Sequence, residues 1–474
     1  MELTETPGLD TELKQLITTS QAWYFNVIPA EIEKGVLKFF FPENKDPNGT
    51  AAEMEVLLGR EVELVKVPES WFMERLSRYY PNAHSNRGTE TLNTGTGDLL
   101  TLMLEEAAKI KSSDIHLEAF EERCRVRFRI DGKLVERYII PCGDYPALIN
   151  KIKIKSHLDI SEKRLPQDGR IIYDEGGFKF DIRVSILPTL HGEKVVLRLL
   201  NRDATQIQLD RLGFSKSQLK DYTEGVSNPN GIVLISGPTG SGKTTTLYAT
   251  LKLLNKSETN ILTVEDPIEY TLEGINQVQL KESIGLTFAS ALRTFLRQDP
   301  DIIMVGEIRD TETAQMAIRA ALTGHLVLST IHTNSALGTI TRLMDMDIAP
   351  YLIASTIKLS VAQRLVRILC PRCKKEEPFK ASLLPVNFKP PFVPEKHSIP
   401  VGCPHCYYTG YNGRRAVYEM IPVDEDLKDR IRMNQLDANS WFSEKNIETL
   451  SSQAFKLFAR GETSLLEVHS LFNL

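Results

Sequence analysis

An eight-residue segment near the middle of this 474-residue chain has the composition of a phosphate-binding loop. Gly237-Pro238-Thr239-Gly240-Ser241-Gly242-Lys243-Thr244 fits the pattern G-x-x-x-x-G-K-[ST] in full. The glycines let the backbone curl so that several N–H groups face one anion, and the amino end of a following helix adds its dipole. We expect Lys243 to contact the β- and γ-phosphates of a nucleotide, Thr244 to bind Mg²⁺, and the segment through Thr245 to hold the nucleotide.

Two carboxylates follow short apolar runs farther along the chain. Glu265 comes after the run 261–264, and Glu307 stands one residue beyond the run 302–305. Because the carboxyl ends of strands line the ligand crevice in open α/β sheets, these side chains could position water or hold Mg²⁺ through water. Many P-loop enzymes carry an aspartate where this chain has Gly306, so we expect Glu307 alone to polarise the attacking water. A helix cap is the alternative for either carboxylate.

A histidine stands at each end of the apolar run 326–331, His325 before it and His332 after it. A lone histidine is usually a satisfied core or surface residue. A histidine beside a nucleotide-binding sheet could instead report on the γ-phosphate, and of these two we expect His325 to do so.

Four of the six cysteines form two close pairs. C-x₂-C spacing recurs after 29 residues, which gives four thiolates suited to a closed tetrahedral Zn²⁺ site: Cys370, Cys373, Cys403 and Cys406. The alternative is four reduced, unliganded thiols. Cys124 and Cys142 stand apart in the sequence, and we expect both to be inert.

The composition is that of a soluble globular protein, with 42% hydrophobic and 25% charged residues and a net charge of −5. No apolar run approaches the ~20 residues that span a bilayer. The acidic first residues lack the basic and apolar regions of a secretory signal. Any membrane role is therefore expected to run through partners.

Several elements must position these residues. From Gly231 onward, apolar runs at 232–235, 261–264, 302–305 and 326–329 alternate with helical stretches such as 245–254, which indicates a largely parallel sheet covered on both faces. Six prolines between Pro378 and Pro400 argue against a helix or central strand there. From about Ala416 the pattern predicts helices.

The upstream half predicts an α+β region. Two hairpins are expected, one turning at Asp131-Gly132 after the alternating run 126–130, the other at Gly176-Gly177 between 170–173 and 178–183. A buried helix face is expected before them, formed by Leu99, Leu100, Leu102, Met103, Ala107 and Ile110. Residues 1–80 mix strand-like runs such as 35–41 with an amphipathic helix at 71–80, and 81–97 is predicted to be a linker.

The motifs together resemble the type II secretion and type IV pilus assembly ATPases over about residues 98–474. The resemblance rests on the phosphate-binding loop and on segments 265–269, 297–301, 306–310, 113–118, 164–170 and 409–414, together with the two histidines and the cysteine pairs. Residues 1–80 resemble the family's amino-terminal adaptor domain more loosely, around 59–65.

The resemblance implies an α/β fold with a RecA-like P-loop core at 205–365. It also implies an adaptor at 1–80, an α+β (PAS-like) domain at 98–204, a zinc knuckle at 366–415 and a helical region at 416–474. The implied protein is a homohexamer that hydrolyses ATP with Mg²⁺ in the cytoplasm. It would lie at the inner membrane through platform proteins bound by residues 1–80, without nucleic acid. We expect no cyclic-dinucleotide ligand, because the family's Arg-Leu-Gly motif is absent near the start.

Arginine is expected to complete the site, because phosphoryl transfer spreads negative charge over the γ-phosphate oxygens. Arg170 and Arg183 lie on the two arms of the second hairpin, and Arg198 is a weaker third candidate. The resemblance places this hairpin at the ring interface, so we expect these arginines to act on ATP held by a neighbouring subunit. Surface ion pairs worth under ~1 kcal/mol each are the alternative.

Two other functions stay open. A pilus retraction or conjugation ATPase shares the nucleotide core, but such relatives typically lack the adaptor segment and the four cysteines. A nucleotide-binding scaffold with little turnover is disfavoured by Lys243 and Glu307. DNA translocation would need a groove of stacking or phosphate-tracking residues. The alternating Arg123, Arg125, Arg127 and Arg129 instead favour a solvated or subunit-facing strand face.

Overall fold

The protein is described by a computed structural model whose contacts divide the chain into two units, Met1–Thr89 and Glu90–Leu474. Among the described residues, the first unit has one hydrophobic core and the second has three. The described residues are 13, 16–17, 19–33, 36–45, 47, 49–69, 71–72, 75–76, 90–91, 98–175, 177–201, 208–385, 388–436, 438–445 and 447–473.

The first unit is a small α+β domain. Its three strands lie in the order β1-β2-β3, with β1 (Ile28–Glu33) antiparallel to β2 (Val36–Pro42) and β2 parallel to β3 (Val62–Val67). Helix α3 (Thr50–Leu58) connects the parallel pair, and α2 (Thr19–Phe25) precedes the sheet. Phe39, Phe41, Met54 and Phe72 fill the core. Within the predicted helix 71–80, the described residues 71–72 and 75–76 are helical, and the others lie outside the described residues.

The predicted linker 81–97 lies largely outside the described residues. Its two described members, Glu90 and Thr91, form a short strand, β4, that pairs in parallel with β7 (Lys133–Ile140). Nothing in the sequence indicated this short strand, because backbone hydrogen bonding along a sheet edge requires no apolar side chains.

A seven-stranded sheet of order β4-β7-β6-β5-β10-β9-β8 forms the first part of the second unit. Its other strands are β5 (Asp114–Ala119), β6 (Cys124–Ile130), β8 (Gln167–Glu175), β9 (Phe178–Thr189) and β10 (Gly192–Asn201). Both predicted hairpins are confirmed, as the antiparallel pairs β6–β7 and β8–β9. Helices α5 (Leu99–Lys109) and α6 (Tyr145–Lys155) share a hydrophobic core with this sheet. Leu102, expected in the buried face of α5, is 48% exposed.

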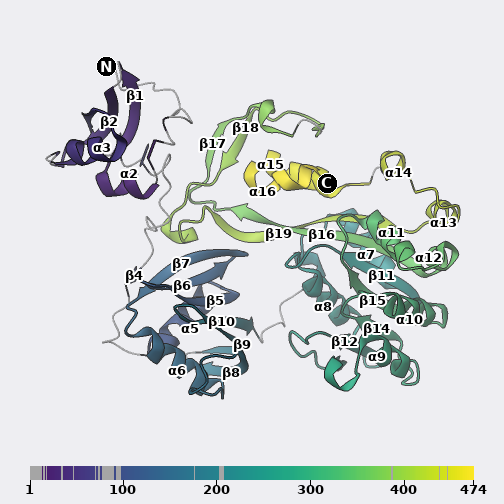
Figure 1. The fold of residues 1–474 in the computed structure, drawn as a ribbon. Helices are drawn as coiled ribbons and strands as arrows, with labels where there is room; N and C mark the ends of the chain where they lie inside the picture. The colour runs from purple at the N-terminus through teal and green to yellow at the C-terminus, as the bar shows by residue number, and fades with distance from the viewer. Residues whose placement is uncertain are drawn as a thin grey trace. The chain divides into compact units, whose positions relative to one another are not determined.

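The nucleotide domain is built on a second seven-stranded sheet, of order β13-β12-β14-β15-β11-β16-β19. Six of these strands are parallel: β13 (Asn276–Gln279), β12 (Ile261–Glu265), β14 (Ile302–Val305), β15 (Leu326–Ile331), β11 (Gly231–Ser236) and β16 (Ile357–Leu369). All four predicted apolar strands are therefore confirmed. β19 (Tyr411–Pro422) runs antiparallel along β16, and the two form a long ribbon (Figure 1).

Helices cover both faces of this parallel sheet, as predicted. One core contains residues of α7 (Lys216–Val226) and α8 (Lys243–Leu254). The other contains residues of α9 (Phe288–Phe295), α10 (Thr311–Leu322), α11 (Ala336–Asp345) and α12 (Pro350–Thr356). Along β11, Ile232 and Leu234 enter the second core while Val233 and Ile235 enter the first, so successive side chains alternate between two buried faces.

The end of the chain differs in part from the prediction. Residues 416–422 belong to strand β19, not to a helix, because Ala416 to Ile421 is a short buried run whose periodicity does not separate strand from helix. The predicted helices follow it: α13 (Glu425–Arg432), α14 (Ala438–Lys445), α15 (Leu450–Ala459) and α16 (Leu465–Val468). The described proline-rich residues contain no α-helix. They form only a three-residue 3₁₀ helix and the two-stranded sheet β17 (Lys375–Pro378) with β18 (Lys396–Ile399).

Across the described ranges, no helix combines the length and the apolar character that crossing a bilayer requires.

Candidate nucleotide-binding and hydrolysis site

The phosphate-binding loop connects β11 to α8, as predicted, and it packs against β16. Gly237 has φ 148° and Gly242 has φ 88°. A Cβ atom at Gly237 would lie 2.5 Å from the Gln363 carbonyl oxygen, and one at Gly242 would lie 2.9 Å from Gln363 Nε2. Both positions therefore require glycine. Gln363 Nε2 donates to the Ser241 carbonyl at 2.9 Å, and Thr246 donates to Gln363 Oε1 at 2.9 Å, so this side chain fixes the loop.

Lys243 closes the loop on itself. Its Nζ donates to the carbonyl oxygens of Gly237 at 2.7 Å and Pro238 at 3.2 Å. Burial lowers the pKa of Lys243; the Glu307 carboxylate opposes that shift and the Arg364 guanidinium adds to it. A bound phosphate would place a negative charge next to this partly buried ammonium. Lys243 could then exchange its two neutral carbonyl acceptors for a charged phosphate oxygen, which forms a stronger hydrogen bond.

Glu307 lies just beyond the end of β14 and is paired through both carboxylate oxygens. Oε1 forms an ion pair with Arg309, and Oε2 lies 3.1 Å from His332 Nε2. Arg309 Nη2 also lies 3.6 Å from Asp266 Oδ2, after the end of β12. Arg309 and His332 thus hold the predicted water-polarising carboxylate in one orientation, beside the phosphate-binding loop.

Glu265 is the last residue of β12 and is 4% exposed. Its Oε1 accepts hydrogen bonds from Thr263 at 2.6 Å and from Gln277 at 3.0 Å, and Oε2 accepts one from Tyr248 on α8. Three donors leave this carboxylate little freedom to turn, so it presents a fixed negative charge to the cleft. That arrangement suits an indirect contact to Mg²⁺ through water better than movement during the reaction.

One cleft of about 600 Å³ brings these groups together. Its lining includes the phosphate-binding loop, both glutamates and, from the upstream seven-stranded sheet and its flank, Ser113 and Arg198. The lining residues include Ser113, Arg198, Thr239, Gly240, Ser241, Gly242, Lys243, Thr244, Thr245, Glu265, Asp266, Glu307, His332 and Arg414. Thr244, at the amino end of α8, is in this lining, as a Mg²⁺ ligand must be. The cleft can therefore hold a nucleotide phosphate chain between a cation, a helix amino end and an oriented carboxylate.

His332, and not His325, is the histidine of this site. The parallel register pairs Gly231 with Leu326 at one end of β11 and Ser236 with Ile331 at the other. His325 precedes Leu326, where its backbone oxygen accepts from the Gly231 N–H and its Nδ1 lies 2.9 Å from the Ala320 oxygen. The structure thus places His325 away from this cleft, because a residue before a parallel strand lies at the sheet edge opposite the phosphate-binding loop.

The predicted arginines are placed differently from one another. Arg170 pairs with Asp181 on the neighbouring strand and is exposed. Arg183 donates to the Ile268 carbonyl and lies 3.7 Å from Glu269, in the segment that follows Glu265. Arg198, the weakest candidate from the sequence, is the one that lines the cleft, where its Nε donates to Asp114 at 3.0 Å.

Sequence reasoning missed the supporting groups. Arg309 stands two residues after Glu307, within the segment 306–310, but this spacing alone does not predict the ion pair between them. Gln363 and Arg364 lie on β16, far along the chain from the loop they support. Polar and charged residues, including Lys358, Gln363 and Arg367, interrupt the apolar residues of β16, so no apolar run marked this segment as a strand.

The four predicted zinc cysteines gather in one place. Their sulfur atoms all lie within 4.8 Å of one another. Sγ–Sγ separations are 3.9 Å for Cys370–Cys403, 3.8 Å for Cys373–Cys406 and 3.7 Å for Cys403–Cys406. Four thiolates about 2.3 Å from a tetrahedral metal have sulfurs about 3.8 Å apart, so the donor set fits Zn²⁺. All four cysteines are free of disulfide bonds.

The fold and the cleft define a P-loop ATPase, with a doubly covered parallel sheet, a complete phosphate-binding loop and a strand-end glutamate beside it. The family model described as "Type II/IV secretion system protein" matches residues 94–470. This chain belongs to that family, and the resemblance seen in its motifs is confirmed.

Relatives in this family are similar over most of the chain. The "Type II secretion system protein E" of Pseudomonas aeruginosa is 53% identical over 339 residues, covering 70% of this chain and 66% of that protein. The "Type IV pilus assembly ATPase PilB" of Myxococcus xanthus is 45% identical over 422 residues, covering 81% of this chain and 74% of that protein.

Solved structures show the same fold. The pilus retraction motor PilT, crystallised with bound ADP, has a TM-score of 0.54 and 26% identity, covering 79% of this chain and 97% of PilT. The Legionella pneumophila ATPase DotB has a TM-score of 0.61 and 22% identity, covering 81% of this chain and 99% of DotB.

The two histidines at the ends of β15 provide a matched test of the site. We expect His332→Ala to lower kcat for ATP by about 10²-fold or more, because Glu307 loses a partner that orients it. His325→Ala is expected to stay close to the native rate. Steady-state phosphate release measures both. Equal loss in the two variants would contradict this placement of the site.

Proposed function

We propose that this chain forms a homohexameric ring that couples ATP hydrolysis to type II protein secretion or type IV pilus assembly. It would work in the cytoplasm, held at the inner membrane through platform proteins. The supporting observation is the single cleft that joins Lys243 to an oriented Glu307, in a chain whose relatives are named as secretion protein E and PilB.

The chain's own residues divide the work of hydrolysis. Lys243 leaves the Gly237 and Pro238 carbonyls to contact the β- and γ-phosphates, while backbone N–H groups of the loop surround the phosphate oxygens. Glu307, held by Arg309 and His332, polarises the attacking water. Mg²⁺ held by Thr244, with Glu265 behind it, would neutralise charge on the phosphate oxygens.

Pilus retraction is the nearest alternative. The match to PilT covers 97% of PilT but only 79% of this chain, so part of this chain has no counterpart in that motor. Retraction relatives typically lack the amino-terminal segment and the four cysteines, so these two features favour assembly or secretion over retraction. A scaffold with negligible turnover is disfavoured, because a water-polarising carboxylate would have no use there.

We propose that residues 1–80 bind the platform proteins at the inner membrane. Capture of membrane proteins by the purified chain tests this role. Immobilised full-length chain, and a matched chain of residues 90–474, are each incubated with detergent-solubilised inner membranes from the source cells. We expect the full chain to retain integral proteins of a secretion or pilus platform and the shortened chain to lose them. Equal retention by both chains would assign membrane attachment to the second unit.

We expect one Zn²⁺ per chain at Cys370, Cys373, Cys403 and Cys406. A closed four-thiolate site leaves no position for substrate, so this metal would be structural and would join the two ends of the proline-rich segment. Metal analysis of protein purified without chelator measures it. Cys373→Ala should lose the zinc, whereas Cys142→Ser should keep it. Far less than one zinc in the native chain would rule the site out.

The arginine proposal is that Arg170 and Arg183 act on ATP bound by a neighbouring subunit. Arg170 is 62% and Arg183 33% exposed, so both can meet a second chain. Subunits with both arginines changed to Ala are mixed with Glu307→Gln subunits, each nearly inactive alone. We expect mixed rings to regain ATPase activity, because some sites then combine an intact glutamate with a neighbour's intact arginines.

The matched control for this experiment is Lys179→Ala, which removes an exposed cation from the same hairpin. It should hydrolyse ATP at the native rate. Full activity of the double-arginine variant alone would show that these arginines form only surface ion pairs.

A further inference from the structure

Two cysteines outside the nucleotide and metal sites lie side by side. Cys124 and Cys142 were expected to be separate, inert thiols, yet their Sγ atoms are 3.5 Å apart. The hairpin register explains this, because Cys124 at the start of β6 is paired with Ile140 near the end of β7. Cys142 follows two residues later, so the antiparallel return of the chain brings the two thiols together.

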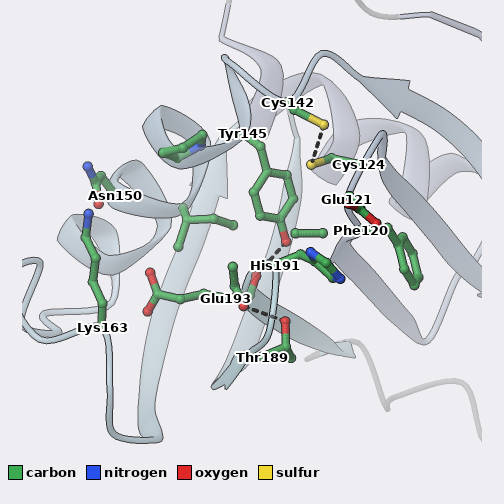
Figure 2. Close-up of a pocket in the computed structure, with 14 residues that line it drawn as sticks. Phe120, Glu121, Cys124, Cys142, Tyr145, Asn150, Lys163, Thr189, His191 and Glu193 are labelled. Atoms are coloured by element: carbon green, nitrogen blue, oxygen red, sulfur yellow. Dashed lines mark hydrogen bonds between the residues drawn. The ribbon is translucent and has the colours of Figure 1, made fainter.

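A cavity of about 330 Å³ opens beside this pair, and both cysteines are among its lining residues (Figure 2). Cys142 is exposed, whereas Cys124 is 3% exposed. In Figure 2 a dashed line marks the contact between the two sulfurs, and the Tyr145 ring lies next to them. A small reagent can therefore reach Cys142 from solvent and find Cys124 directly behind it.

We propose that Cys124 and Cys142 are a redox modification site, which forms a reversible disulfide when the protein meets a hydroperoxide. The Cys142 thiol gives its proton to water, its thiolate attacks the outer peroxide oxygen, and the O–O bond breaks; the expelled alkoxide takes up a proton from water and leaves as an alcohol (or as water, from hydrogen peroxide). The resulting sulfenic acid is attacked by Cys124. The S–S bond forms, the S–O bond breaks, and water leaves with the Cys124 proton. One hydroperoxide is reduced and two thiols are oxidised.

The environments of the two thiols assign these roles. Burial raises the pKa of Cys124 to about 12, and the neighbouring Cys142 adds to the shift, so Cys124 stays protonated until a sulfenic acid stands next to it. Exposure makes Cys142 the thiol that meets the oxidant. Since a disulfide bond is about 2.05 Å long, the sulfurs must approach by only about 1.5 Å.

The proposed bond would join the β6–β7 pair to the start of α6. Tyr145, three residues after Cys142, opens this helix and donates to the Glu193 carbonyl on β10 at 2.7 Å. β10 is also the strand that carries Arg198 into the nucleotide cleft. Disulfides in reducing compartments are typically transient and redox-sensing, which is the behaviour expected of an accessible pair.

The experiment exposes reduced, full-length protein to increasing hydrogen peroxide, blocks the remaining thiols with N-ethylmaleimide, and quantifies peptides by mass spectrometry. We expect a peptide pair linked through Cys124 and Cys142 to accumulate before any loss of metal or modification at the four clustered cysteines. A dithiol reductant should restore both thiols. Amide hydrogen exchange in residues 140–146 should slow in the oxidised protein.

Two variants separate the steps. Cys124→Ser should leave Cys142 as a sulfenic acid that dimedone labels, whereas Cys142→Ser should leave Cys124 reduced at the same peroxide concentration. The proposal is overturned if native Cys142 passes to sulfinic acid without the linked peptide, or if both thiols stay reduced when a surface thiol on a control protein is oxidised. Equal oxidation of Cys124 in the Cys142→Ser variant would also contradict it.

Discussion

The parallel alignment of β11, β12, β14 and β15 is the constraint on which the rest of the site depends. Their register brings the carboxyl ends of all four strands to one edge of the sheet. The phosphate-binding loop, Glu265, Glu307 and His332 each stand at or just past one of those ends, although nearly 100 residues separate the first from the last. Burial of both sheet faces fixes this register, because a shifted strand would place its apolar side chains out of step with two cores.

Strands β16 and β19 supply buried polar side chains that support the same site. Gln363 supports the loop directly, and the neighbouring Arg364 donates to the Gln363 and Asn334 carbonyl oxygens, each at 3.0 Å. Asn334 lies two residues after His332, so one buried guanidinium joins the strand that supports the phosphate loop to the segment that carries His332, the partner of Glu307. Burial raises the pKa of Glu419 on β19, which accepts the Ala336 N–H at 2.8 Å at the start of α11. Polar contacts at such depth favour one geometry over neighbouring ones.

Sequence predicted those features that local chemistry determines. The phosphate-binding loop, the four apolar strands, both hairpins and the cysteine pairs were each legible in a short segment. Features set by register were not. The choice between His325 and His332 depended on strand direction, the Cys124–Cys142 contact on a hairpin return, and the β19 strand on pairing with β16. Arg309 was visible in a motif, but its ion pair with Glu307 arises only from the turn after β14.

Lys243 is expected to bind the nucleotide, and Glu307 to polarise the water that hydrolyses it, within one cleft. The most direct test measures binding of a fluorescent ATP analogue and phosphate release on the same preparations of native, Lys243→Ala and Glu307→Gln protein. We expect Lys243→Ala to lose binding, and Glu307→Gln to bind as the native chain does while its turnover falls by about 10²–10⁴-fold. Native turnover in Glu307→Gln would contradict the account.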